Sequence, residues 1–407
     1  MIEIKGGVCA PKGFLAGGIR CGIKPSSQKK DLALIYSRKI CNAAAVFTTN
    51  RVKAASVRLS QEHAADGKLR AVIANSCNAN ACTGQEGMNA ARRMAQMVAN
   101  EFSIEPSQVA VASTGVIGVP LPVDMIEKNA AALKASLRDD EQGHADALEA
   151  IMTTDVRKKE IAVEMEIGGQ PVRIGAMTKG SGMIHPNMAT MLAFITTDAA
   201  IAGNALDASL RLAVKRSFNR LTVDGDTSTN DMVVIMANGE AGNESISVDD
   251  KNHETFTEAL EYVCAALAKM MARDGEGASK LVTVTVAGAN CEQTAEILAK
   301  SVASSSLVKA ACFGADANWG RVLCAMGYAG VEFNPEKTNV SFKSRAGETE
   351  VCKNGGPVSF SEEKAKLILC EEEIEIIIHI QEGDGTASVW GCDLTYDYVK
   401  INGDYRS

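Results

Sequence analysis

Apolar and polar positions along the chain define short strands and amphipathic helices. In the first third, the apolar run 71–74 predicts a buried strand, residues 88–102 carry Ala and Met at helical spacing, and 108–112 predicts a second buried strand. Helices are expected next over 122–137 and 140–152. Strands and helices are therefore expected to alternate in this part of the chain.

The period of the pattern changes to two after Lys159. Apolar residues alternate with polar ones from Ile161 to Ile167, Gly168-Gly169 supplies a turn, and the alternation resumes at Val172. This pattern predicts a β-hairpin that leads directly into a glycine-rich segment, Lys179 to Gly182.

The remaining residues continue the mixture of helices and strands. No long Pro- or Ser-rich linker divides the chain, and no repeat of solenoid length is present. The expected fold class is α/β, with helices layered over mixed β-sheets. The predicted helices are 203–219, 254–273 and 292–304, and the predicted strands are 232–236, 281–286, 374–380 and 387–398.

Composition excludes several classes of partner. Of the 407 residues, 46% are hydrophobic and 23% are charged, as in ordinary globular proteins, and the net charge is -8. Nucleic acids and anionic membranes attract basic surfaces, so neither is expected as a partner. No apolar run is long enough to span a membrane, and the first residues do not resemble a secretory signal. We expect a cytoplasmic protein that acts on small polar substrates.

The spacing of the cysteines and histidines does not predict a metal site. The 12 cysteines form no Cys-x-x-Cys pair and most lie in apolar surroundings, so buried, reduced thiols are expected, and the 5 histidines are scattered. The segment 222–231 has aspartates spaced as in a calcium loop but lacks the closing glutamate, so we expect a polar loop at the mouth of an active site. The early glycines do not form a dinucleotide fingerprint.

Thr190 lies at a position where self-cleavage would make it an N-terminal nucleophile. A threonine hydroxyl needs a nearby base to attack a carbonyl, and the residue's own α-amine is one, once the preceding peptide bond is cut. Gly180 and Gly182 permit an unusual turn, Pro186 fixes one dihedral, and Ala189 leaves the scissile carbonyl accessible. Such a turn favours an acyl shift from nitrogen to the hydroxyl oxygen, followed by hydrolysis.

The residues alone do not single out Thr190. A β-branched residue at the start of a buried strand is ordinary, and the apolar run 191–195 predicts such a strand. We expect this strand to hold a new N-terminus in the core.

Five segments, in order and over nearly the whole chain, carry a family resemblance. They resemble segments of the ornithine acetyltransferase (ArgJ) family, the bifunctional glutamate N-acetyltransferases of arginine biosynthesis. The segments are STGVIG (113–118), KGSGMIHPNMATML (179–192), DGEGASK (274–280), FGADANWGR (313–321) and DLTYDYVKIN (393–402).

The resemblance implies both the architecture and the reaction. The fold would be of the self-processing N-terminal-nucleophile type, similar to ArgJ and DmpA. Cleavage between Ala189 and Thr190 would give chains 1–189 and 190–407, which stay associated in an α2β2 heterotetramer with a smaller C-terminal part. The acetyl group of N-acetylornithine would pass to Thr190 and then to glutamate, without a cofactor. Some members also take acetyl from acetyl-CoA, and both alternatives remain open here.

The resemblance also implies roles for individual residues. Thr114 and Gly115 would form the oxyanion hole that a tetrahedral intermediate requires. In the substrate pocket, Lys179 would meet a carboxylate, and Glu276 an ammonium group or the Thr190 amine. The further substrate contacts would be Thr153, for which Thr154 is the competing assignment, and at the C-terminal end Asn402 and Ser407.

Three positions depart from the family pattern. Ser279 and Ser407 replace threonines, and Gly403 replaces an alanine. A serine keeps the hydroxyl and loses a methyl group, so we expect these changes to affect substrate fit and not the class of reaction.

Two other functions remain compatible with the residues. One is an N-terminal-nucleophile aminopeptidase or amidohydrolase of related fold, in which water replaces glutamate as acceptor. The other is a binding protein that keeps the fold and stays uncut.

Overall fold

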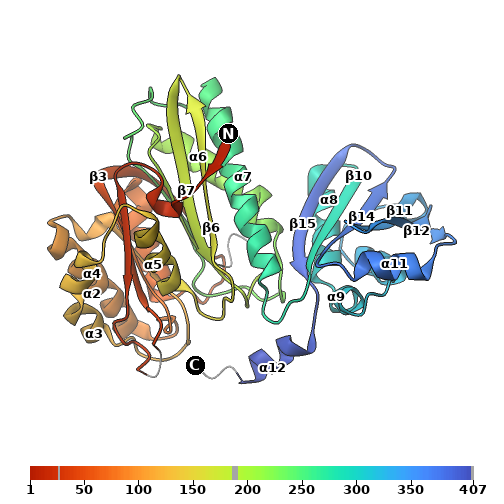
Figure 1. Cartoon of the computed structure of the whole chain (residues 1–407), viewed down its shortest axis with the longest axis horizontal. Helices are drawn as coiled ribbons and strands as arrows, with labels where there is room; N and C mark the ends of the chain where they lie inside the picture. The colour runs from red at the N-terminus through yellow and green to blue at the C-terminus, as the bar shows by residue number, and fades with distance from the viewer. Residues whose placement is uncertain (26–27, 186–190, 405–407) are drawn as a thin grey trace.

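Two β-sheets with helices packed against them make up the protein (Figure 1). The structure is a computed structural model that describes residues 1–25, 28–185 and 191–404. Ala189, Thr190 and Ser407, all predicted to belong to the functional site, lie outside the described residues. The expected α/β class, with helices layered over mixed sheets, is confirmed.

The larger sheet has nine strands within the described residues. Their order is β1-β6-β7-β8-β9-β3-β4-β5, and β2 pairs with β3. The pairs β8–β9 and β4–β5 are parallel and the others antiparallel. The strands are β1 (Ile2–Ile4), β2 (Phe14–Ile19), β3 (Leu32–Phe47), β4 (Lys68–Asn75), β5 (Val109–Ser113), β6 (Lys159–Ile167), β7 (Gln170–Lys179), β8 (Leu192–Thr197) and β9 (Met232–Ala237).

Strand β8 lies inside this sheet. Leu192 pairs with Lys179 on β7 and with Met232 on β9, and every residue of β8 is buried. The preceding Met191 is 3% exposed. The prediction of a buried strand after residue 190 is therefore confirmed.

Successive side chains of β8 point to opposite faces of the sheet. Ala193 and Ile195 join a buried cluster with residues of α6 (Gly203–Arg216) and α7 (Lys251–Arg273). Phe194 joins a cluster on the opposite face with Leu148 of α5 (Glu141–Ile151). Strands that are covered on both faces read as continuous apolar runs, as 192–195 does.

Further helices cover the sheet near β5. They are α1 (Ala55–His63), α2 (Gly84–Phe102), α3 (Val123–Lys128) and α4 (Ala130–Ala135). The expected single helix over 122–137 is wrong, because it is interrupted at Asn129. The Asn129 side chain donates a hydrogen bond to the Met125 carbonyl at 2.8 Å, and asparagine side chains compete in this way with helical backbone bonds.

The smaller sheet is built from residues after 280. Its order is β13-β12-β11-β14-β10-β15, and helices pack on one face around a second core. Its strands are β10 (Leu281–Ala289), β11 (Thr338–Ser344), β12 (Gly347–Lys353), β13 (Gly356–Pro357), β14 (Glu373–Ile380) and β15 (Gly385–Cys392), and its helices are α8 (Glu292–Ser304), α9 (Ser306–Phe313), α10 (Trp319–Gly327) and α11 (Glu362–Leu369).

The end of the chain differs from the expectation. The predicted strand 387–398 stops at Cys392, and Tyr396–Asp404 forms helix α12. The Asp393 carboxylate accepts the N–H groups of Ser279 and Lys280, which turns the chain away from the sheet edge. In Figure 1, α12 extends from the smaller sheet to a position beneath the larger one.

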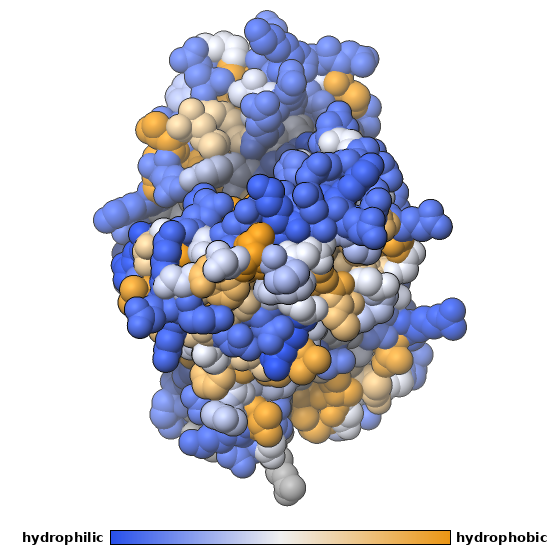
Figure 2. Space-filling model, turned by 90° about the vertical axis from the view of Figure 1, so that its right-hand side faces the viewer, coloured by the Kyte–Doolittle hydropathy of each residue, from blue (hydrophilic) through white to orange (hydrophobic). Residues whose placement is uncertain are grey.

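The surface is mostly polar where the smaller sheet faces outward. Figure 2 shows hydrophilic residues over much of that side, with apolar residues in small groups. Within the described part of the chain, no helix combines the length and apolarity that a membrane span requires. Seven of the twelve cysteines are buried and all are free thiols, as expected for most of them.

Truncation of Phe194 tests the central position of β8. Phe194→Ala removes a ring that is 1% exposed, so the free energy of unfolding should fall by about 3–5 kcal/mol. Leu367→Ala, at a position 67% exposed on α11, serves as the control and should change it by about 0.5 kcal/mol or less. Denaturant unfolding followed by circular dichroism measures both. Equal stability of the two variants would contradict a buried β8.

Candidate functional site

A small polar cavity is lined by residues from six parts of the chain. Its volume is about 140 Å³. All six predicted site residues that the structure describes line it, namely Thr114, Gly115, Thr153, Lys179, Glu276 and Asn402. Thr154, Gly182, Met183 and the loop residues Ser228, Thr229 and Asn230 line it too. The segment 222–231, expected at the mouth of an active site, thus contributes three residues to the lining of this cavity.

Gly115 occupies a backbone conformation that only glycine fits. Its φ is +135°, and a Cβ atom there would lie 2.2 Å from the Cys77 carbonyl carbon and 2.4 Å from the Asn78 nitrogen. The neighbouring Val116 exchanges backbone hydrogen bonds with the same segment, donating to Cys77 at 3.3 Å and accepting from Ala79 at 2.9 Å. The turn after β5 is thus held closely against residues 77–79.

Two hydrogen-bond donors remain at this turn. The Thr114 N–H donates to the Asn75 carbonyl at 2.9 Å, but the Thr114 hydroxyl accepts a bond from Lys179 and keeps its own proton. The Gly115 N–H has no protein acceptor among the described residues. A hydroxyl and a backbone N–H are the types of donor that stabilise an oxyanion.

Lys179, the last residue of β7, joins two sides of the cavity. Its Nζ lies 2.8 Å from Thr114 Oγ1 and 3.4 Å from Thr153 Oγ1. Burial lowers the pKa of Lys179, while the nearby carboxylates of Asp155, Asp231 and Glu276 act in the opposite direction. Of the two adjacent threonines, Thr153 contacts Lys179, although Thr154 also lines the cavity.

Glu276 and Asn402 meet on the other side. Asn402 Nδ2 donates to Glu276 Oε2 at 2.8 Å, so α12 brings the end of the chain to the cavity. A Cβ atom at Gly182 would lie 2.3 Å from Glu276 Oε2. The glycine therefore leaves room for the carboxylate beside the glycine-rich segment.

Asp224 holds the chain just before the predicted cleavage point. Its carboxylate accepts the N–H groups of Met183 at 2.6 Å and Ile184 at 2.8 Å. His185 Nδ1 lies 3.0 Å from the Thr222 hydroxyl, and burial lowers the pKa of His185 to about 4, so this ring is neutral near pH 7. Asp224 thus binds backbone groups, and the described residues include no cluster of three or more His, Cys, Asp or Glu able to hold a metal ion.

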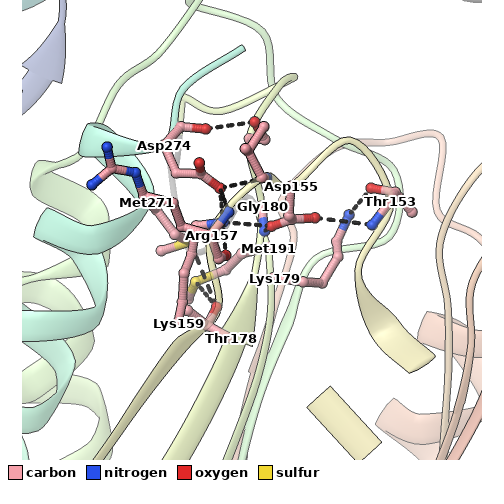
Figure 3. A network of polar contacts seen from close by, with 12 residues as sticks. Thr153, Asp155, Arg157, Lys159, Thr178, Lys179, Gly180, Met191, Met271 and Asp274 are labelled. Carbon is pink, nitrogen blue, oxygen red and sulfur yellow. Dashed lines mark hydrogen bonds and ion pairs between the residues drawn. The ribbon is translucent and has the colours of Figure 1, made fainter. Parts of the chain in front are cut away.

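Sequence patterns missed several charged residues beside the cavity. Asp155, Lys159 and Asp274 form a buried network next to Gly180 (Figure 3). Asp231 is 2% exposed, its Oδ2 has no partner among the described residues, and burial raises its pKa well above the usual value. Charged side chains are normally exposed, so nothing in the pattern distinguished these four from surface residues.

The departures at Ser279 and Gly403 lie away from the cavity. The Ser279 hydroxyl binds the Asp393 carboxylate, and a Cβ atom at Gly403 would meet nothing within 4 Å. Neither residue lines the cavity. The expectation that these two changes affect substrate fit stays a prediction.

Known proteins resemble the chain over its full length. The model of the ArgJ family matches residues 15–407. An arginine biosynthesis bifunctional protein ArgJ from Symbiobacterium thermophilum is 52% identical over 405 residues, 99% of each chain. A glutamate N-acetyltransferase from Methanothermobacter thermautotrophicus is 49% identical over 409 residues, 99% of this chain and 98% of that relative.

A solved structure is similar as well. The crystal structure of an arginine biosynthesis bifunctional protein ArgJ from Bacillus halodurans matches with a TM-score of 0.50 and 47% sequence identity. The match covers 52% of this chain and 98% of that one. With the family match over residues 15–407 and two full-length relatives near 50% identity, the chain belongs to the ArgJ family.

Proposed function

We propose that this enzyme cuts itself between Ala189 and Thr190 and then transfers the acetyl group of N-acetylornithine to glutamate through Thr190. The observation that carries the proposal is the convergence of six predicted residues on one cavity. Thr190 precedes Leu192 by two residues, and Leu192 pairs with Lys179, which lines that cavity. The names of the two full-length relatives support an acetyltransferase of arginine biosynthesis.

In the self-cleavage step, the Thr190 hydroxyl oxygen attacks the Ala189 carbonyl carbon. A new C–O bond forms, the C–N bond breaks, and the nitrogen leaves as the free amine of Thr190. Water then hydrolyses the ester and releases a carboxylate on Ala189. The Thr114 hydroxyl and the Gly115 N–H are the donors that would stabilise the oxyanion of each tetrahedral intermediate.

In the transfer step, the freed amine acts as the base for the Thr190 hydroxyl. The hydroxyl takes the acetyl group of N-acetylornithine, ornithine leaves as an amine, and the amine of glutamate then accepts the acetyl group. Lys179 is placed to pair with a substrate carboxylate, and Glu276 with an ammonium group. The volume of about 140 Å³ suits a small amino-acid substrate, since sites for drug-sized ligands are usually about 300–1,000 Å³.

The two chains would remain together after cleavage. Strands β8 and β9 follow the predicted cleavage point, yet they lie in the sheet between β7 and β3, which precede it. Separation would expose the buried edges of four strands, so one folded unit persists. The Bacillus halodurans chain matches over about half of this chain, and residues 190–407 are likewise about half of it. An α2β2 heterotetramer working in the cytoplasm, without a cofactor, completes the proposal.

The relatives favour transfer over hydrolysis. Relatives of aminopeptidase activity at comparable identity would support the alternative of an N-terminal-nucleophile aminopeptidase. The two relatives near 50% identity are instead a bifunctional ArgJ protein and a glutamate N-acetyltransferase. The word bifunctional in the first name supports acetyl-CoA as a second acetyl donor.

Replacement of the nucleophile tests self-cleavage. Thr190→Ala lacks the attacking oxygen, so purified protein should run as one band near 42.9 kDa on a denaturing gel, whereas the wild type should give two smaller chains. Thr386→Ala, at an exposed position in β15, is the control and should cleave as the wild type does. Cleavage of the Thr190→Ala chain at the wild-type rate would remove Thr190 from its role.

Substrate assays test the transfer. Cleaved protein should release ornithine from N-acetylornithine at a rate that depends on glutamate, and N-acetylglutamate should form in equal amount. A parallel assay with acetyl-CoA and glutamate measures the second activity. Ornithine release that is independent of glutamate would identify a hydrolase and contradict the proposal.

Gly115→Ala tests the oxyanion hole. The added methyl group would collide with the backbone at Cys77 and displace the Gly115 N–H, and loss of such a donor slows acyl transfer by about 100-fold or more. Gly118→Ala is the matched control, because Gly118 has φ +82° in the same loop but open space around its Cβ position. The turnover number and the rate of self-cleavage should fall in Gly115→Ala alone. Equal rates in the two variants would exclude the N–H from catalysis.

A further inference from the structure

A buried lysine stands behind the cavity. Lys159, the first residue of β6, is 1% exposed, and its Nζ lies 2.7 Å from Asp155 Oδ1 and 2.5 Å from Asp274 Oδ2. Figure 3 shows the two carboxylates converging on this ammonium group. Lys159 does not line the cavity. Its effect on the site must therefore pass through its two partners.

The Asp155 carboxylate connects Lys159 to two cavity walls. Its Oδ2 accepts the Thr153 N–H at 3.0 Å, and its Oδ1 accepts the Gly180 N–H at 2.8 Å as well as the Lys159 ammonium. Thr153 lines the cavity directly, and Gly180 follows Lys179, which also lines it. The contacts of one carboxylate thus set the distance between these two walls.

Asp274 connects Lys159 to a third wall. The Asp274 carbonyl accepts the Ser181 hydroxyl at 2.6 Å, and the Ser181 carbonyl accepts the Glu276 N–H at 2.9 Å. The Asp274 carboxylate also accepts the N–H groups of Val156 and Arg157, each at 3.1 Å. The glycine-rich segment is therefore held between the partners of Lys159.

We propose that Lys159 is a positioning residue, which holds Thr153, Lys179 and Glu276 in the geometry that self-cleavage and acetyl transfer require. This inference rests on the proposed function. Lys159 touches no reacting atom. It acts by fixing Asp155 and Asp274, and through them the three segments that form the cavity.

Stability alone does not account for a buried ionic cluster. Removing charges from water costs several kcal/mol per ion, and apolar residues of similar volume often give equal or greater stability than a buried ion pair. A directional set of bonds specifies one arrangement of the backbone, which apolar packing does less well. Here the Asp155 carboxylate accepts the backbone N–H groups of Thr153 and Gly180, and the Asp274 carbonyl accepts the Ser181 hydroxyl.

Lys159 also acts on the charge of Lys179. Burial has the largest effect on the pKa of Lys179 and lowers it; among the charged groups, the carboxylates of Asp155, Asp231 and Glu276 raise this pKa and the Lys159 cation lowers it. Removal of Lys159 would therefore raise the pKa of Lys179. The part of the pH–rate profile that follows the titration of Lys179 should then move to higher pH. A purely structural role of Lys159 would not cause this shift.

The test compares two buried lysines. Lys159→Met keeps an unbranched side chain and removes the ammonium group. Lys309→Met is the matched control, because Lys309 is 5% exposed, donates to the Cys392 carbonyl at 2.5 Å and does not line the cavity. For each variant, circular dichroism gives the folded fraction, gels give the rate of self-cleavage, and assays of the cleaved enzyme give kcat and KM against pH.

We expect Lys159→Met to cleave and turn over about 10- to 100-fold more slowly per folded molecule, since small misplacements of reacting groups have effects of this size. Its pH–rate profile should move to higher pH, and Lys309→Met should stay within about two-fold of the wild type. Rates in Lys159→Met that match those of Lys309→Met would overturn the inference.

Asp155→Asn is used in place of Lys159→Met if that variant does not fold. It keeps the volume and leaves Lys159 paired with Asp274, but one amide oxygen replaces two carboxylate oxygens that accept the Thr153 and Gly180 N–H groups. Slow cleavage supports the inference, and a wild-type rate contradicts it. A wild-type chain that neither cleaves nor transfers acetyl would instead contradict the proposed function, so the two failures are distinguishable.

Discussion

The pairing of β8 with both β7 and β9 is the constraint on which the site depends. Leu192 of β8 pairs with Lys179, the last residue of β7, and with Met232, the first residue of β9. Strand β8 is buried on both faces. A chain cut just before this strand cannot come apart into two pieces without breaking a central part of the sheet. The same pairing brings Lys179 at the end of β7 beside the start of β8.

Around that strand, close packing and hydrogen bonds hold the backbone segments of the site in place. The φ of +135° at Gly115 and the close contact with Cys77 fix one wall. Asp224 fixes Met183 and Ile184, directly after the glycine-rich segment, through their backbone N–H groups. The network of Asp155, Lys159 and Asp274 fixes the segment itself. Hydrogen-bond donors that such a backbone holds in place stabilise developing charge without reorganising during the reaction.

The pattern of the sequence predicted most of the larger sheet and little of what supports the cavity. Period-two alternation located the hairpin of β6 and β7, and the apolar run after residue 190 located β8. The break at Asn129 and the helix α12 escaped prediction because each depends on particular side-chain hydrogen bonds. Family resemblance identified the residues that line the cavity. It did not identify Lys159 or Asp231, because burial of a charge is a tertiary property that neither spacing nor composition reveals.

In the proposed reaction Thr190 carries the acetyl group, and mass spectrometry tests that directly. Cleaved protein is mixed with N-acetylornithine in the absence of glutamate, denatured in acid and analysed by mass spectrometry. We expect the chain beginning at Thr190 to gain the mass of one acetyl group, peptide mapping to place that group on Thr190, and added glutamate to remove it. Turnover with no acetylated chain, or with the acetyl group on another residue, would contradict this role of Thr190.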